Sequence, residues 1–192
     1  MPYYIRLMHQ GDISRVTEID REAFPTMMPL ANFRRELGSP LAHYIVACDE
    51  EDKAALTMTE VNRNGEQLVV GFAGFWLMAD EAHIVNLAVR RTYRRLGMGE
   101  LLLISLIELA MDMEASLITL EVRASNTSAR CLYSKYGFID RGLRKRYYTD
   151  NREDAVIMTV DNINSSSYQI KLRQLKKAYS EKWGAPLYQV VH

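Results

Sequence analysis

The stretch HIVNLAVRRTYRRLGMGELLLISLIELAMDM, residues 83–113, decides the fold. It begins with a β-prone apolar run at residues 83–89 and ends with a long apolar segment at residues 100–113, which predicts a helix. Between them lies a basic loop with two glycines. Glycines let a backbone approach a ligand closely, and the free N–H groups at a helix start attract anions. The stretch therefore predicts a strand, a phosphate-binding loop and a helix, although a basic turn shaped by glycines is the alternative for the loop alone.

Two common nucleotide motifs are absent from this loop. A phosphate loop of the ATP-binding type needs Gly-Lys-Ser/Thr, and no Gly-Lys pair occurs in the chain. A dinucleotide-binding fingerprint needs a third glycine where Leu102 stands. Neither ATP nor NAD is supported as the ligand.

Working outward, turn and capping residues divide the rest of the chain into further elements. We expect helices at residues 12–24 (capped by Asp12), 30–37 and 126–137, and strands at residues 43–48, 68–78, 117–123, 138–148 and 155–160. The turn signal Asn64-Gly65 indicates that the strands on either side of it pair antiparallel. After residue 82 the order is β-α-β-α-β-β, which predicts a single α/β or α+β domain.

Composition excludes several classes of protein. The chain has 192 residues and a mass of 22.1 kDa, with 48% hydrophobic and 25% charged residues, and it lacks an apolar run of membrane-spanning length. The two cysteines, Cys48 and Cys131, and the four scattered histidines suit neither a disulfide framework nor a metal site. We therefore expect no metal and no membrane insertion. Because no export signal stands at the start, we expect a cytoplasmic protein.

Charge is divided unevenly along the chain. Residues 1–85 have a balance of minus 6 and residues 86–192 a balance of plus 6, which suggests a polyanionic partner for the second half, either cofactor phosphates or nucleic acid. The alternative, which charge alone favours, is an ordinary solvated surface. Residues 162–192 form a polar linker and a basic amphipathic helix at residues 168–183, appended to a domain at residues 1–161. We expect this helix to pack on the domain or on a second copy, as in a homodimer. Direct nucleic-acid binding is not expected, because no helix-turn-helix or zinc-finger pattern accompanies the charge.

Several linked motifs carry a family resemblance. They are Asn86-Leu87-Ala88-Val89, Arg94-x-x-Gly97-x-Gly99, residues 120–126 (LEVRASN) and Leu132-Tyr133-x-x-Tyr136-Gly137-Phe138. Together they resemble the GNAT family of acetyl-CoA-dependent N-acetyltransferases, closest to the RimI-like branch that acetylates the terminal alanine of a ribosomal protein. The resemblance covers residues 3–161, in order and with the spacing kept.

The resemblance implies a fold and a donor site. The fold would be a mixed, mostly antiparallel central sheet with helices on both faces. The pyrophosphate of acetyl-CoA would lie in the loop, and its pantetheine arm would lie along the backbone of residues 87–89 and be held by Asn126. The implied donor-binding residues are Leu87, Ala88, Val89, Arg94, Arg95, Leu96, Gly97, Met98, Gly99, Glu100 and Asn126. The neighbouring Arg90 and Arg91 replace an Asp-Pro often found in the family, and whether they contact the coenzyme stays open.

Glu121 and Tyr133 are the candidate catalytic residues. Glu121 interrupts an apolar strand, where a carboxylate is costly unless it has a task or a partner, and by resemblance it is the general base. Its alternative is a solvent-facing glutamate on an edge strand. Tyr133 shares a helix face with Asn126, and by resemblance it protonates the departing coenzyme A sulfur. The alternatives are a core aromatic for Tyr133 and a helix cap for Asn126.

The acceptor is predicted to be an α-amine. At neutral pH an α-amine has roughly 400 times more free base than a lysine side chain, which favours protein N-termini. A small-molecule amine such as a polyamine or amino sugar is the alternative acceptor, and a non-catalytic coenzyme A-binding or ribosome-associated module is the alternative of another class. Tyr147 and Tyr148 are expected beside the acceptor, with at least one of them in the core. We expect Arg123 to be structural.

Overall fold

The computed structural model describes residues 3–26, 31–49 and 68–188. Its strands are β1 (Tyr3–Leu7), β2 (Ala42–Asp49), β3 (Leu68–Met78), β4 (Glu81–Val89), β5 (Leu117–Arg123), β6 (Ile139–Arg144), β7 (Ala155–Asp161) and β8 (Leu187–Tyr188). Its helices are α1 (Ile13–Ala23), α2 (Phe33–Leu37), α4 (Met98–Asp112), α5 (Thr127–Lys135) and α6 (Ser166–Trp183), with short 3-10 turns at Gln10–Asp12 and Arg91–Tyr93.

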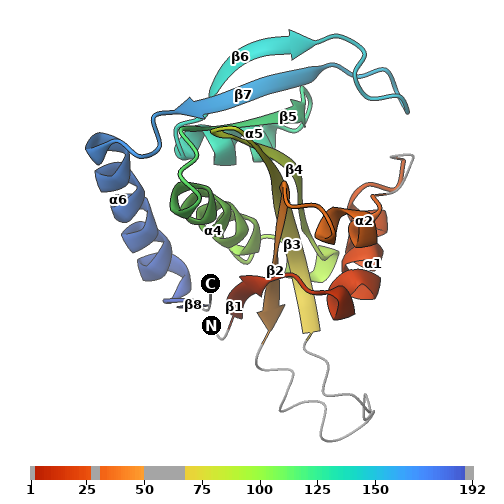
Figure 1. Cartoon of the computed structure of the whole chain (residues 1–192), viewed down its shortest axis with the longest axis horizontal. Helices are drawn as coiled ribbons and strands as arrows, with labels where there is room; N and C mark the ends of the chain where they lie inside the picture. Colours follow the sequence, from red (N-terminus) through yellow and green to blue (C-terminus); the bar gives the residue numbers. More distant parts are fainter. Residues whose placement is uncertain (1–2, 27–30, 50–67, 189–192) are drawn as a thin grey trace, which may run out of the picture.

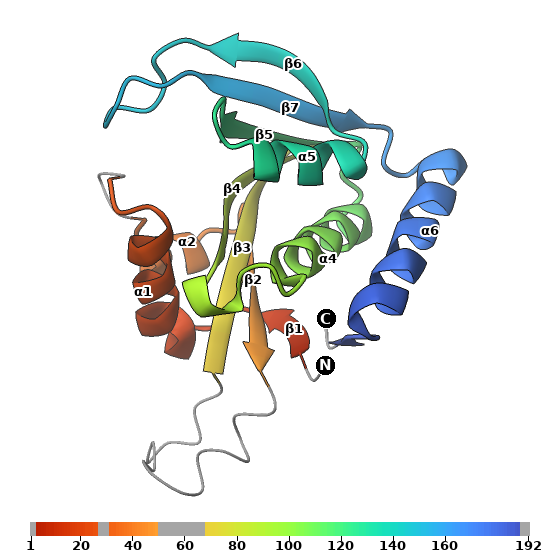
Figure 2. The same cartoon turned by 180° about the vertical axis from the view of Figure 1, so that it is seen from behind.

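All strands belong to one eight-stranded sheet in the order β6-β7-β5-β4-β3-β2-β1-β8 (Figure 1). Neighbours pair antiparallel except β4 with β5 and β1 with β8. Helices α1 and α2 lie on one side of β3 and β4, and α4 lies on the other (Figure 2). Each side has its own buried apolar cluster, one including Val16, Ile19 and Phe33 and the other built around α4. The predicted mixed sheet with helices on both faces is confirmed.

Strands β4 and β5 pair only over their first halves. The parallel register joins Glu81–Ile84 of β4 to Leu117–Leu120 of β5 and stops there. On the other side of β4 the pairing with β3 has an irregularity between Gly74 and Phe75, and such bulges bend a strand and increase its twist. The two strands therefore diverge after Ile84 and Leu120, and the later part of β4 has an edge that β5 does not cover.

Most elements lie where the sequence predicts them. The predicted bounds of β3 and β5 are confirmed, and Gly38 and Gly137 follow the ends of α2 and α5 as expected. The predicted turn at Asn64-Gly65 lies outside the described residues, but the antiparallel pairing of β2 with β3 is confirmed. The second helix begins at Phe33, and residues 27–30 lie outside the described part.

Two expectations about the start of the chain were wrong or incomplete. Asp12 makes no side-chain cap on α1; its carboxylate binds Arg6, with both N–O distances at 2.7 Å, and accepts from the His9 N–H. A bidentate arginine pair is a stronger interaction than a cap bond, which explains the difference. Strand β1 was not predicted, although Ile5 is fully buried, because its short run has no alternating pattern to distinguish it.

The C-terminal helix packs on the rest of the chain. Its buried residues Tyr168, Leu172 and Tyr179 join the core cluster around α4, and the Tyr168 hydroxyl donates to the Tyr136 carbonyl at 3.0 Å. The expectation that its apolar side packs on the domain is confirmed. A homodimer through this helix stays a prediction.

Two kinds of feature are absent from the described residues. Within residues 3–26, 31–49 and 68–188, no helix combines the length and apolar character needed to cross a membrane. The same residues contain no group of three potential metal ligands.

Candidate active site

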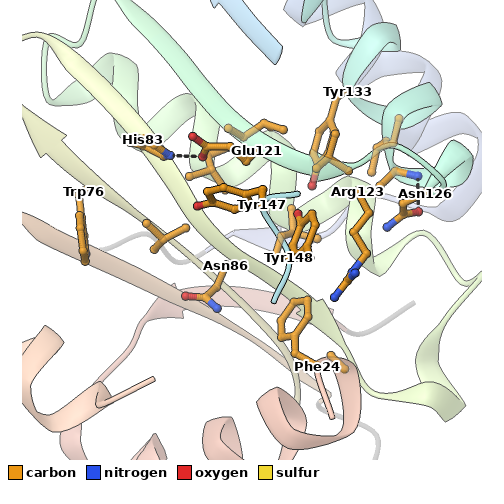
Figure 3. Close-up of a pocket in the computed structure, with 18 of the residues that line it drawn as sticks. Phe24, Trp76, His83, Asn86, Glu121, Arg123, Asn126, Tyr133, Tyr147 and Tyr148 are labelled. Carbon is orange, nitrogen blue, oxygen red and sulfur yellow. Dashed lines mark hydrogen bonds and ion pairs between the residues drawn. The ribbon is translucent and has the colours of Figure 1, made fainter. Parts of the chain in front are cut away.

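A cavity of about 530 Å³ lies where β4 and β5 diverge (Figure 3). Its walls bring together four residues predicted for the site: Leu87 on β4, Glu121 on β5, Asn126 at the start of α5 and Tyr133 within α5. It also contains residues that were not predicted for the site, including His83, Trp76 and Phe24. The divergence of two parallel strands thus creates a pocket at their carboxyl ends, where side chains from both strands and the following helix converge.

Glu121 forms ion pairs with both of its oxygens. Its Oε2 lies 2.6 Å from His83 Nε2, and its Oε1 lies 2.9 Å from Arg144 Nε on β6. The Glu121 side chain is only 9% exposed, so the cost of burying the carboxylate is offset by these partners. The alternative considered for Glu121, a solvent-facing glutamate on an edge strand, is therefore wrong.

The pairing of Glu121 with His83 shifts the pKa values of the two groups in opposite directions. The hydrogen bond from His83 lowers the pKa of Glu121 below its usual value, and the Arg144 charge acts in the same direction. The same hydrogen bond to Glu121 raises the pKa of His83 above 6.5, against the effect of burial. The pair thus holds an ionised carboxylate beside an imidazole of increased basicity.

His83 was not predicted as a site residue, because its contact with Glu121 depends on which strands pair. In the parallel register His83 faces Thr119, and Glu121 follows on the same face of the sheet as Thr119, because side chains alternate. The two side chains are thus diagonal neighbours on adjacent strands. The signal available in the sequence was a histidine at the head of a predicted strand, which suggests no partner by itself.

Tyr133 is a core residue that reaches the cavity. The residue is 8% exposed, and its ring packs 5.7 Å from the Phe138 ring, measured between centroids. Its hydroxyl points toward Tyr147 and Tyr148 (Figure 3). Burial raises the pKa of Tyr133 to about 12, so the hydroxyl stays protonated at neutral pH and can donate a hydrogen bond.

Asn126 caps a helix beside the same cavity. Its Oδ1 accepts a hydrogen bond from the Ala129 N–H at 3.1 Å, and its residue position is the N-cap of α5. The cap leaves the side-chain NH₂ group of Asn126 available as a donor on the cavity wall. The helix cap considered for Asn126 is confirmed, and it is compatible with a role in ligand binding.

The predicted phosphate loop lies next to the cavity and does not line it. Gly97 is the N-cap of α4 with a φ of +82°, and with no side chain it leaves the first N–H groups of the helix uncapped. A Cβ atom at Gly99 would make only an ordinary van der Waals contact, with Leu87 Cδ2 at 3.9 Å. Leu87 therefore connects the loop to the cavity, and the uncapped helix start suits a phosphate group.

The arginines around this loop have different partners. Arg90 donates to the Val69 carbonyl and to Glu18 of α1, both at 3.0 Å, while Arg94 donates to the Val89 carbonyl at 3.0 Å. The Arg91 N–H binds Glu22 of α1. Arg90 thus joins α1 to the sheet, and its charge is paired with Glu18.

Three predicted donor-site side chains point elsewhere. Ala88 is buried in the cluster on the opposite face of the sheet, and Val89 belongs to the core around α4, so only their backbone is available to a ligand. The Glu100 carboxylate accepts from the Tyr136 hydroxyl at 2.7 Å and pairs with Lys135, both near the end of α5. It joins the two helices that border the donor side.

A second set of residues closes the cavity on the far side from the loop. Arg123 donates to Asp150 at 2.9 Å and to Glu153 at 3.2 Å, and its guanidinium lies 3.9 Å from the centroid of the Tyr148 ring. Asp150 also accepts from the Thr26 hydroxyl, which follows α1. The segment between β6 and β7 is thereby fastened both to β5 and to the segment after α1.

This arrangement corrects two expectations. Neither Tyr147 nor Tyr148 lies in the core; their rings make an edge-to-face contact at 5.3 Å on the cavity wall, and Tyr147 is 45% exposed. Arg123 has the structural contacts expected of it, yet it also lines the cavity. Since Arg123 stands two positions after Glu121 on a strand, the two side chains share a face.

Comparison with known proteins agrees with the motifs and the fold. The sequence profile described as Acetyltransferase (GNAT) family matches residues 13–138. A Bacillus subtilis protein provisionally named [ribosomal protein bS18]-alanine N-acetyltransferase is 38% identical over 157 residues, covering 81% of this chain and 93% of that protein. The N-alpha-acetyltransferase RimI of Mycobacterium tuberculosis is 32% identical over 167 residues, covering 84% and 94%.

A solved structure gives the same picture. The ribosomal-protein-S18-alanine N-acetyltransferase from Escherichia coli superposes with a TM-score of 0.67 at 29% identity, covering 83% of this chain and 94% of that one. The matched profile covers the glycine loop, Glu121, Tyr133 and all residues that line the cavity except Tyr147 and Tyr148. The chain therefore belongs to the GNAT family and is an N-acetyltransferase.

Proposed function

We propose that this enzyme transfers the acetyl group of acetyl-CoA to the N-terminal α-amine of a protein, of the ribosomal-protein-alanine type. The observation that carries the proposal is a single cavity with a carboxylate–imidazole pair, Glu121 and His83, and a protonated phenol, Tyr133. Amide formation from a thioester needs a proton acceptor for the amine and a proton donor for the sulfur. Relatives named for acetylating the alanine of ribosomal protein bS18 support this acceptor class.

The donor side would be built from backbone groups. Acetyl-CoA supplies a thioester whose acetyl group passes to nitrogen as the carbon–sulfur bond breaks. The uncapped N–H groups after Gly97 would bind its pyrophosphate. The edge of β4 beyond Ile84, which β5 leaves uncovered, would hydrogen-bond the pantetheine arm along Leu87–Val89, and Asn126 would donate to it from the other wall.

Glu121 and His83 would act together as the general base. An isolated carboxylate whose pKa lies below its usual value is poorly matched to an α-amine of pKa about 7.8. The imidazole of His83, made more basic by Glu121, is better matched and takes the proton as the amine attacks. Glu121 then keeps its negative charge and stabilises the imidazolium.

Tyr133 would supply the proton to the departing sulfur. Its hydroxyl remains protonated because burial raises its pKa to about 12, so it is a donor throughout the neutral range. A thiolate of pKa about 8.5 gains stability from such a hydrogen bond as its charge develops. The phenol recovers its proton from solvent after the product leaves.

The acceptor side favours a peptide over a small polycation. Three large exposed apolar side chains, Trp76, Met78 and Tyr147, line the cavity and provide a surface for peptide side chains. Among the described residues that line it, Glu121 is the single carboxylate, and it is already neutralised by His83 and Arg144. A polyamine would find no free negative charge on these walls.

The closed far side favours a chain end. The bonds from Asp150 to Thr26 and Arg123 join the segments that flank the cavity, and in this proposal the acceptor enters end-on instead of lying across that side. A free N-terminus meets this demand better than a lysine in the middle of a chain. We place the reaction in the cytoplasm, consistent with the exposed free thiol of Cys131, which persists in a reducing compartment.

The test compares acceptors that differ only in the amine. Acetyl-CoA consumption is measured with a peptide starting with alanine, the same peptide blocked at its α-amine but carrying an internal lysine, and spermidine. We expect turnover with the free α-amine alone, and mass spectrometry should find the acetyl group on the first residue. Faster turnover of spermidine or of the lysine peptide would overturn the proposed acceptor.

A further inference from the structure

The last residue of α6 packs against the glycine that starts α4. A Cβ built on Gly97 would lie 2.9–3.0 Å from three atoms of the Trp183 indole, closer than real Cβ atoms approach. Gly97 also has a φ of +82°, a conformation that other residues rarely adopt. The contact with Trp183 and the positive φ therefore each favour glycine at position 97. The first of these constraints comes from the C-terminal extension.

The other end of α6 is fastened to α5. The Tyr168 hydroxyl donates to the Tyr136 carbonyl at 3.0 Å, and Lys171 Nζ lies 3.3 Å from a Cβ built on Gly137, which follows α5. In the middle, Lys176 pairs with Glu108 of α4. Helix α6 runs alongside α4 on its outer side, away from α1 and α2 (Figure 2). It therefore connects the start of α4 to the end of α5.

These two places border the proposed donor site from opposite sides. The start of α4 carries the uncapped N–H groups, and α5 carries Asn126 and Tyr133 on the cavity wall. Helix α6 packs along α4 and against residues 136–137, which follow α5. It does not line the cavity itself, so its effect has to pass through the backbone of the loop.

We infer that Trp183 is a positioning residue for the acetyl donor: its indole holds the backbone at Gly97 so that the first N–H groups of α4 stay aligned for the pyrophosphate. The inference rests on the proposed function, which assigns this loop to the donor. Glycine is the most flexible residue, so without the indole the loop would have to be ordered at the moment of binding. Preorganisation of this kind raises affinity by removing that ordering cost.

Trp183→Ala tests this role, with Trp183→Phe as the conservative variant. Coenzyme A affinity is measured by titration calorimetry, and turnover is measured at saturating acetyl-CoA. We expect Trp183→Ala to weaken coenzyme A binding roughly tenfold, equivalent to about 1.4 kcal/mol, with kcat little changed. Trp183→Phe should restore most of the affinity. Ile170→Ala, on an exposed position of the same helix, should bind like the wild type.

A double-mutant cycle identifies the contact itself. Gly97→Ala places a methyl group against the indole in the wild type, but in a Trp183→Ala background that clash is gone and only the backbone strain remains. The loss of coenzyme A affinity caused by Gly97→Ala should therefore be several-fold smaller in the Trp183→Ala background. This coupling identifies the contact, whereas the loss of coenzyme A affinity in Trp183→Ala separates positioning from packing.

The outcomes separate this inference from the donor assignment. If Trp183→Ala lowers the melting temperature but keeps the coenzyme A affinity of the wild type, Trp183 is packing only and the inference is wrong. Equal effects of Gly97→Ala in both backgrounds would also overturn it. Neither result touches the donor assignment, which fails instead if Gly97→Asp still binds coenzyme A.

Discussion

The donor side and the acceptor side of this enzyme are built in different ways. The donor loop comes from one continuous stretch, in which a strand, two glycines and a helix start follow each other directly. The acceptor side is assembled from β4, β5, the segment between β6 and β7 and the segment after α1, which are far apart in sequence. A local site depends on backbone conformation, whereas an assembled site depends on side-chain pairs. Substitutions on the donor side should therefore weaken coenzyme A binding, whereas substitutions on the acceptor side should change turnover or selectivity.

The largest effect is expected on the donor side, from Gly97→Asp. The substitution forces a side chain into a φ of +82°, drives it into Trp183 and places a negative charge beside the proposed pyrophosphate. Coenzyme A binding, measured by titration calorimetry, should fall below detection. Gly38→Asp is the matched control, because Gly38 has a φ of −87° and a Cβ there would meet its nearest neighbour, the Arg35 carbonyl oxygen, at an ordinary 3.5 Å; this variant should bind normally. Normal binding by Gly97→Asp would remove the loop from the donor site.

The contrast also explains what could be predicted from the sequence. The bounds of β3 and β5 and the loop before α4 follow from periodicity and glycine placement, which are local signals. Glu121 and Tyr133 were found through the motif, and the structure brings them to one cavity. The partners of Glu121 could not be found in this way, because His83 and Arg144 meet it through the register of four strands, β4, β5, β7 and β6.

The same limit applies to the edges of the fold. Strand β1 has no local signature and is defined by its pairing with β2. The two tyrosines expected partly in the core line the cavity instead, because Arg123 holds Tyr148 there from the neighbouring strand. In each case the decisive interaction joins residues that are brought together by the fold. A single sequence does not show that such residues are neighbours.

The next largest effect is expected from Glu121→Gln, which tests the pair at the centre of the acceptor side. The amide keeps the shape but loses the charge that makes His83 a stronger base, so kcat at pH 7 should fall by about 10² to 10⁴. Acetyl-CoA affinity should change little, because Glu121 does not belong to the donor loop. This separates an acceptor-side failure from the donor-side failure of Gly97→Asp.

The pH profile of the same variant has a defined sign. In the wild type the hydrogen bond to Glu121 raises the pKa of His83 above 6.5, so kcat should decline below that raised value as the imidazole becomes protonated. Without the carboxylate this pKa falls, and the acid limb of kcat should move to lower pH. His83→Asn should lose activity to a similar extent, and the double variant should lose little more. An unmoved limb would show that His83 is not the titrating base.

A smaller effect is expected from Tyr133→Phe, at the boundary between the two sides. The change removes one hydroxyl and keeps the ring that packs on Phe138, so folding and acetyl-CoA binding should persist. Loss of a hydrogen bond to a developing thiolate should lower kcat by roughly 10- to 100-fold. Tyr4→Phe, which removes a hydroxyl from a buried tyrosine away from the cavity, should leave kcat unchanged. Thermal unfolding on the same preparations separates catalysis from stability, and full activity of Tyr133→Phe would remove it from the mechanism.

The smallest effect is expected from Thr26→Val, which should alter selectivity between acceptors more than rate. Valine keeps the shape of threonine but cannot donate to Asp150, so the bond between the segments that flank the cavity is lost, while Asp150 keeps Arg123. The donor loop is untouched, and acetyl-CoA affinity should equal that of the wild type. A looser far side should raise the KM for the alanine peptide a few-fold and allow measurable acetylation of the α-blocked lysine peptide. Thr17→Val, which removes a hydroxyl bonded within α1, controls for the loss of a threonine hydroxyl elsewhere. If Thr26→Val keeps the full preference for the free α-amine, the closure between these segments does not select the acceptor, and selectivity has to come from the amine's own basicity acting on the Glu121–His83 pair.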